Sequence, residues 1–256
     1  MSPYIRNFAL HCLKKGYRAV AVNWRGCHDT PLLTSRPYSI VSSSDVHDAI
    51  QHVHKLYPNS PLIGIGYSLG SNLLSKYLGE VGDDTPLMTG IGFANPHDFH
   101  LISEYCDAPL VKYSYNRRLA NNLVNFVKRH EEVFGKDARL NLEEIKKCTN
   151  MRQVDERFMI KVLDFPSVKH YYQEGSSRFY IPNIKIPYLI CNALDDPLIP
   201  VHSIGYEECR RNENVVLALT RCGGHLGWFE GLLPWSKTWA DRVALEWIEA
   251  VSSSQK

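Results

Sequence analysis

The chain has 256 residues, of which 44% are hydrophobic and 22% are charged, so it can bury one sizeable core and has a length common for one α/β domain. Its 29 Lys and Arg against 27 Asp and Glu give a net charge of +2, without a long run of either sign. That balance argues against a nucleic-acid partner and leaves attraction to a membrane weak.

The seven cysteines are scattered and form no Cys-x-x-Cys pair, which excludes a zinc-ribbon spacing and favours reduced thiols in a cytosol-facing protein. A membrane span needs about 18 or more consecutive apolar residues, and the first residues of the chain hold neither such a run nor a cleavable signal. As written, the chain is expected to be cytoplasmic or peripheral to a membrane.

The first part of the chain predicts helices and strands in turn. Apolar residues recur at helical spacing from Ile5 to Leu13, and the apolar run at 17–24 (YRAVAVNW) predicts a strand. Residues 42–60 predict a helix with Ser and Asp at its start and Pro58 near its end.

The next two elements surround a short motif. Residues 61–67 (PLIGIGY) predict a strand buried on both faces, and residues 69–78 resume helical spacing. Ser68 is therefore expected at a strand-to-helix turn.

The rest of the chain continues the alternation after one interruption. Residues 87–95 predict a strand, and residues 95–180, rich in charges and aromatics, predict a mainly helical insertion. Two further strands are expected at 186–194 and 214–220, with a helical stretch between them at 202–211. A closing amphipathic helix is expected at 234–251.

Alternating strands and helices predict an α/β fold with a largely parallel sheet flanked by helices, in which reactive loops lie at the carboxyl ends of the strands. No repeat or low-complexity linker divides the chain. We expect one domain, 1–256, with a core at 1–94 and 181–256 and a lid-like insertion at 95–180.

The motif Gly66-Tyr67-Ser68-Leu69-Gly70 has the Gly-x-Ser-x-Gly spacing of a nucleophile elbow. A serine hydroxyl is a poor nucleophile at neutral pH, so it needs a general base and a carboxylate that orients the base. The sharp turn presents the hydroxyl of Ser68, and Gly66 and Gly70 are expected to leave room for close backbone packing.

Two candidate partners follow in the order Ser, Asp, His that this arrangement uses. Asp195 and Asp196 come just after one predicted strand, and His225 comes just after the next. We favour Asp196 as the acid because it stands four residues before Pro200, while Asp195 stays open as the alternative or as a supporting group in the loop.

Other clusters have simpler explanations. His97 and His100, with Asp98 between them, could suggest a metal, but pairs of His at this spacing are frequent by chance and no third ligand lies nearby. Cys27 lacks His and Asn partners for a reactive thiol. Neither a metal nor a cofactor is therefore expected. Basic residues of the insertion fit either anionic lipid head groups or a solvated helix face, and its aromatic residues fit either an acyl-chain pocket or a lid core. These residues are Lys112, Arg117, Arg118, Lys128 and Arg129, and Tyr105, Tyr113, Tyr115, Phe126 and Phe134.

The stretches YIRNFALHCLKKGYRAVAVNWRGC, LLTSRPYS, GYSLGSNLLSKYLGEVGDDTPL, ALDDPLIP and GGHLGWFEG resemble, nearly end to end, one group of α/β-hydrolase-domain proteins. That group comprises membrane-anchored phospholipases and the related medium-chain ethyl ester synthase/esterases. The resemblance implies an esterase or lipase acting on phospholipid or medium-chain acyl esters, with its triad at Ser68, Asp196 and His225. It also implies membrane association for the family. A membrane-surface contact of this chain and its oligomeric state both stay open.

The resemblance further implies a hydrophobic anchor, the first strands of the sheet and a His-Gly loop immediately before the YIR helix, where this chain has Met1-Ser2-Pro3. The chain is therefore expected to be an N-terminally truncated member that keeps only the Leu69 amide of the usual oxyanion pair. Three functions stay open: hydrolysis of lipid esters, alcohol acyl transfer from acyl-CoA, and a binding role of an inactive isoform or fragment.

Overall fold

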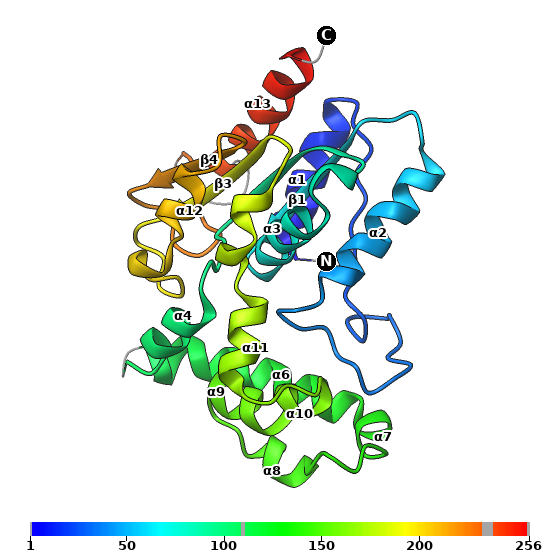
Figure 1. Ribbon diagram of the computed structural model, residues 1–256, viewed down its shortest axis with the longest axis vertical. Helices are drawn as coiled ribbons and strands as arrows, with labels where there is room; N and C mark the ends of the chain where they lie inside the picture. The colour runs from blue at the N-terminus through cyan, green and yellow to red at the C-terminus, as the bar shows by residue number, and fades with distance from the viewer. Residues whose placement is uncertain (1, 109–110, 232–237, 255–256) are drawn as a thin grey trace. The chain divides into compact units, whose positions relative to one another are not determined.

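A computed structural model describes residues 2–108, 111–231 and 238–254, with only the backbone at Lys112. The chain divides into two compact units (Figure 1). Unit 1 contains residues 1–22, 43–97 and 177–256, and unit 2 contains residues 23–42 and 98–176. Unit 2 thus includes a segment before the predicted insertion, and the boundaries of one domain with an insertion at 95–180 stay a prediction.

Unit 1 is built on a parallel sheet with the strand order β1-β2-β3-β4 in the described residues. Its strands are the four predicted from buried apolar runs: β1 Leu62–Tyr67, β2 Leu87–Phe93, β3 Tyr188–Ala193 and β4 Val215–Thr220. Every residue of β3 is buried, as expected of a strand covered on both faces. All four strands end at one edge of the sheet, and the segments that begin at Ser68, Ala94, Leu194 and Arg221 follow there.

Helices cover both faces of this sheet. On one face, α1 and α13 pack against β2 and β3 through Phe8, Ile248, Phe93 and Leu189. On the other face, α2, α3 and α12 form a second core with alternate residues of the same strands. These helices span Pro3–Lys14 (α1), Ser43–Leu56 (α2), Leu69–Val81 (α3), Tyr206–Arg210 (α12) and Trp239–Ser254 (α13). Short 3₁₀ turns lie at Gly82–Asp84 (η1), Ser177–Phe179 (η4), Ile181–Asn183 (η5) and Val201–Ser203 (η6).

The predicted helices are present in unit 1, although the closing one begins at Trp239 in the described residues. The expected start of that helix, residues 234–237, lies outside them. Among the described residues, no helix combines the length and the apolar composition that crossing a membrane requires.

The strand predicted at 17–24 was wrong. The segment is irregular, and Val20 and Val22 expose 54% and 53% of their surface. A strand needs a neighbour that accepts and donates its backbone hydrogen bonds, and among the described residues β1 is the edge of the sheet and does not pair with this segment. The preference of Val and Tyr for strands is therefore not enough here.

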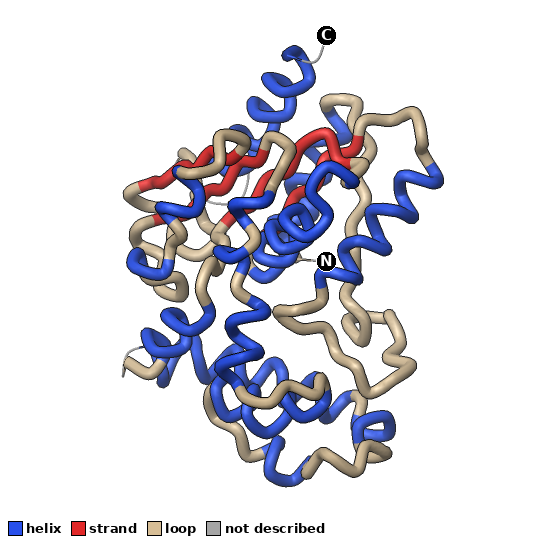
Figure 2. Tube along the Cα trace, in the orientation of Figure 1, coloured by secondary structure: helices blue, strands red, loops and turns tan. Residues whose placement is uncertain are grey.

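The described residues of unit 2 form helices and loops, and the strands β1 to β4 belong to unit 1 (Figure 2). Its helices span Phe99–Cys106 (α4), Arg117–Arg129 (α6), Glu131–Phe134 (α7), Leu142–Lys146 (α8), Met151–Val154 (α9), Ile160–Val162 (α10) and Val168–Gly175 (α11), with π-helical turns at Lys112–Asn116 (η2) and Asp155–Met159 (η3). The mainly helical character predicted for 95–180 is confirmed.

The aromatic residues of unit 2 divide between its core and its surface. Phe126 and Phe134 are buried, and the Phe134 and Phe158 rings pack edge to face at 4.9 Å. Tyr113 and Tyr115 instead expose 73% and 44% of their surface. The Phe126 and Phe134 side chains therefore form the core of the unit, which favours the lid-core explanation for that pair.

A carboxyl group is also buried in this core. Asp155 Oδ2 accepts a 2.6 Å hydrogen bond from the Tyr172 hydroxyl. Burial raises the pKa of Asp155 to about 7, against the lowering effect of that hydrogen bond. Burial therefore favours the protonated form of this carboxyl more than solvent does.

Candidate active site

Ser68 lies at the sharp turn between β1 and α3, as the motif predicts. Its φ of 51° and ψ of −118° are unusual for a residue with a side chain. Its amide donates a 2.8 Å hydrogen bond to the Phe93 carbonyl, and its own carbonyl accepts from the Ser71 and Asn72 amides at 2.9 and 3.1 Å. These bonds hold the Ser68 backbone in the turn, from which its hydroxyl extends.

The two glycines of the motif are not equivalent. A Cβ added at Gly66 would lie closer than 3.0 Å to the Gly70 carbonyl and 2.6 Å from Ser71 Cα, so only glycine fits without a backbone shift. A Cβ at Gly70 would meet no described atom within 4 Å. The expectation of close packing holds for Gly66 and was wrong for Gly70.

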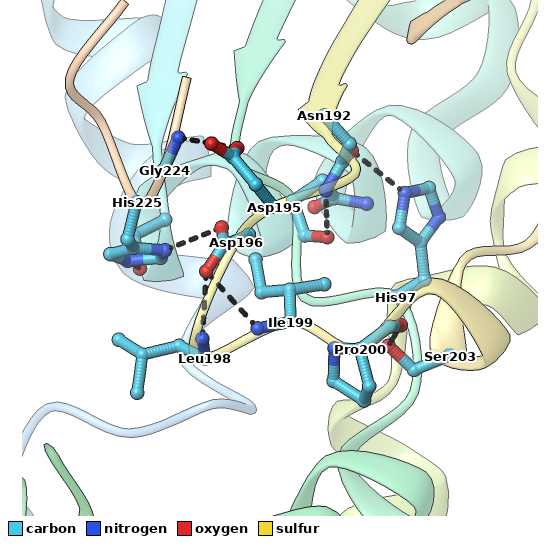
Figure 3. Close-up of polar contacts among 12 residues, drawn as sticks. His97, Asn192, Asp195, Asp196, Leu198, Ile199, Pro200, Ser203, Gly224 and His225 are labelled. Atoms are coloured by element: carbon cyan, nitrogen blue, oxygen red, sulfur yellow. Dashed lines mark hydrogen bonds and ion pairs between the residues drawn. The ribbon is translucent and has the colours of Figure 1, made fainter. Parts of the chain in front are cut away.

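Asp196 lies in the turn after β3 with its side chain buried, at a residue exposure of 5%. One carboxylate oxygen, Oδ1, accepts from the amides of Leu198 and Ile199 at 2.8 and 3.2 Å, and Oδ2 faces His225 Nδ1 at 2.8 Å (Figure 3). The turn thus holds the Asp196 carboxylate in one orientation against the imidazole.

His225 lies in the loop after β4, with its ring between the carboxylate and the serine. Its Nε2 is 2.9 Å from Ser68 Oγ. Because a carboxylate only accepts, the proton of the neutral ring is assigned to Nδ1, and Nε2 accepts from the Ser68 hydroxyl. This arrangement suits proton removal from Ser68.

The loop that carries His225 is fixed to the end of β4. The Gly223 carbonyl accepts from the Gly227 and Trp228 amides at 3.0 and 3.1 Å, and the Trp228 indole donates to Thr220 Oγ1 at 2.8 Å. The His225 Nδ1 partner is Asp196, whereas Asp195, the alternative acid, accepts from the Gly224 amide at 2.8 Å. The structure therefore brings Ser68, Asp196 and His225 together and directs Asp195 to the backbone.

Leu69 is the first residue of α3, immediately after Ser68. The N–H groups of a helix's first turn have no carbonyl partner within the helix, so they are free to bind an anion there. The Leu69 amide is thus at the position expected of an oxyanion donor.

The sequence did not predict a buried polar network at the ends of β2 and β3. Asn192 Nδ2 donates to the Asn95 carbonyl at 3.1 Å, and His97 Nε2 lies 3.2 Å from Asn192 Oδ1 (Figure 3). Asn95 Nδ2 reaches Ser177 Oγ at 3.1 Å, and the Ser177 amide donates to Asn72 Oδ1 at 3.0 Å. The signal available in the sequence was a polar residue close to the end of each of these apolar strands, Asn95 after β2 and Asn192 within β3.

His97 and His100 do not form a pair of ligands. His97 contacts Asn192, whereas His100 Nε2 lies 3.1 Å from the Lys169 carbonyl. Across residues 2–108, 111–231 and 238–254, no group of three or more His, Cys, Asp or Glu side chains is placed to hold a metal ion.

Curated relatives cover most of the chain. Human phospholipase ABHD3 is 35% identical over 236 residues, which are 92% of this chain and 57% of the relative. Monoacylglycerol lipase ABHD2 of Danio rerio is 32% identical over 269 residues, which cover 99% of this chain and 61% of that protein. The chain is similar over nearly its whole length to these α/β-hydrolase-domain proteins. It spans less than two thirds of the length of these relatives, and no family model matches it.

Solved structures support the fold of this chain. The monoacylglycerol lipase of Paleococcus ferrophilus has a TM-score of 0.57 at 14% identity and covers 95% of this chain and 88% of its own. A thermophilic esterase from Thermogutta terrifontis has a TM-score of 0.56 at 13% identity over 97% of this chain and 85% of its own. At these identities the likeness establishes the α/β-hydrolase fold alone.

Proposed function

We propose that this chain is a serine hydrolase that cleaves carboxylic esters of lipids through Ser68, His225 and Asp196. The observation that carries the proposal is the continuous contact from Ser68 Oγ to His225 Nε2 at 2.9 Å and from His225 Nδ1 to Asp196 Oδ2 at 2.8 Å. A nucleophile, a base and an orienting acid in that order support acyl transfer through a covalent intermediate.

In the proposed first half-reaction, the Ser68 oxygen bonds to the ester carbonyl carbon while its proton passes to His225 Nε2. The carbonyl oxygen becomes an oxyanion that accepts from the Leu69 amide, and Asp196 stabilises the imidazolium. The bond to the alcohol then breaks, the proton moves from His225 to that alcohol, and the acyl group stays on Ser68.

In the second half-reaction, His225 removes a proton from water and the resulting oxygen bonds to the acyl carbon. The bond to Ser68 breaks, the proton returns to the serine, and the fatty acid leaves. An alcohol in place of water would give a new ester, so the competing function, acyl transfer from acyl-CoA, uses the same residues and differs in donor and acceptor.

The names of the relatives support the substrate class. Phospholipase ABHD3 and monoacylglycerol lipase ABHD2 are both named for lipids in which a fatty acid is esterified to glycerol. We propose this acyl ester as the shared chemistry for the present chain. Membrane contact, also predicted from the resemblance, stays a prediction.

A product assay tests the proposal. The purified chain is given a monoacylglycerol, a phosphatidylcholine, or acyl-CoA with ethanol, and free fatty acid and ethyl ester are measured. We expect fatty acid from a lipid ester with the wild type and the control Ser44→Ala, an exposed serine of α2, and none with Ser68→Ala. Ethyl ester as the sole product would support the acyltransferase instead, and equal fatty acid release by Ser68→Ala would contradict the role of Ser68.

A further inference from the structure

Two adjacent carboxylates after β3 contact two adjacent residues after β4. Asp196 Oδ2 faces the His225 ring at 2.8 Å, and Asp195 Oδ1 accepts from the Gly224 amide at 2.8 Å (Figure 3). The two strands are neighbours whose register ends at Ala193 opposite Thr220, and the Leu194 amide donates to the Thr220 carbonyl at 2.8 Å. The two turns therefore leave the sheet side by side.

The Asp195 contact acts on the Gly223–Gly224 peptide group, directly before the peptide that leads into His225. Gly224 has a φ of +56°, in the left-handed region, where glycine moves more freely than other residues. The Asp195 carboxylate holds the Gly224 N–H and so limits, from the side that enters Gly224, the rotation of the backbone that leads into His225. The carbonyl end of the same peptide, at Gly223, accepts from the Gly227 and Trp228 amides, so Asp195 and the loop hold this peptide from both ends.

The exposure of Asp195 argues against a role in stabilising the core. Asp195 is exposed and Asp196 is buried, and a single exposed polar contact contributes little to the free energy of unfolding. The same contact has more influence on the rate, because a displacement of about 1 Å in a reacting group can lower turnover about 100-fold.

We propose that Asp195 is a positioning residue that holds the Gly224 amide and thereby aligns His225 between Asp196 and Ser68. The inference rests on the proposed function of that site. The two aspartates then have different roles. Asp196 orients the imidazole ring, and Asp195 orients the backbone that carries the ring.

Two substitutions separate the hydrogen bond from the charge. Asp195→Ala removes both, whereas Asp195→Asn removes the charge and keeps an oxygen that can accept from the Gly224 amide. We expect Asp195→Ala to lower kcat for a soluble p-nitrophenyl ester about 10- to 100-fold, with KM changed less than about 3-fold. Asp195→Asn should restore kcat to within about 3-fold of the wild type.

The control is Asp84→Ala, which removes the same charge at an exposed position of η1 and should leave kcat unchanged. Melting temperatures are measured for every variant, and hydrogen exchange of the Gly224 amide should be faster in Asp195→Ala than in the wild type or Asp195→Asn. If Asp195→Ala keeps the wild-type kcat, or if Asp195→Asn is as impaired as Asp195→Ala, the inference is wrong.

Ser68→Ala, measured in the same series, distinguishes the two ways of failing. Activity that survives in Ser68→Ala contradicts the proposed function itself. An inactive Ser68→Ala beside a fully active Asp195→Ala contradicts only the positioning role.

Discussion

Replacing His225 with alanine is expected to lower kcat for ester hydrolysis by about 10⁴- to 10⁶-fold, and Ser68→Ala should lower it by a similar factor. In the structure, His225 Nε2 is the group within hydrogen-bonding distance of Ser68 Oγ. Without this base the hydroxyl stays protonated, and without the hydroxyl the base has no nucleophile to activate. The measurement is steady-state hydrolysis of a soluble ester.

The double variant sharpens this prediction. Residues that act as one unit are non-additive, so Ser68→Ala with His225→Ala should be no slower than either single variant within about tenfold. His52→Ala, at an exposed position of α2, is the matched control and should keep the wild-type kcat. A His225→Ala variant that retains kcat within tenfold of the wild type would contradict the role of the imidazole.

Gly66→Ala is expected to damage the site far more than Gly70→Ala, although both add one methyl group to the same motif. The methyl group at Gly66 would collide with the backbone of Gly70 and Ser71, so the turn that presents Ser68 must shift. We expect kcat to fall about 100-fold or more and the melting temperature to fall with it.

At Gly70 the methyl group meets no described atom within 4 Å, and the residue lies in the first turn of α3. Alanine is favoured over glycine in a helix by up to about 1 kcal/mol. Gly70→Ala should therefore keep kcat within about fivefold and leave the melting temperature equal or higher. Equal loss of kcat in the two variants would show that the close backbone approach does not maintain the turn.

The positions of Ser68, Asp196 and His225 were predictable because the order of strands along the chain determines which loops meet. Parallel strands end at one edge of the sheet, so residues that follow β1, β3 and β4 come together there although 157 positions separate Ser68 from His225. The sequence favoured Asp196 over Asp195 only through its distance from Pro200, because both aspartates follow the same strand. The turn's backbone conformation decides which carboxylate meets the ring and which meets the Gly224 amide.

Other features depend on neighbours that local patterns do not reveal. The apolar run at 17–24 has the composition of a strand but has no pairing partner in the described residues. The network of Asn72, Asn95, Ser177 and Asn192 joins segments up to 120 positions apart, and none of these residues belongs to a recognisable spacing. At Gly70 the local pattern predicted too much: its place in the motif suggested that close backbone packing requires glycine, and the packing does not require it.

Covalent labelling with a fluorophosphonate probe tests the proposed nucleophile most directly, because the probe forms a phosphorus–oxygen bond with an activated serine and releases fluoride. After digestion and mass spectrometry of the labelled chain, the adduct should lie on the peptide that contains Ser68. It should be absent from Ser68→Ala and form much more slowly in His225→Ala. An adduct on a different serine, or equal labelling of the wild type and Ser68→Ala, would contradict the assignment of Ser68 as the nucleophile.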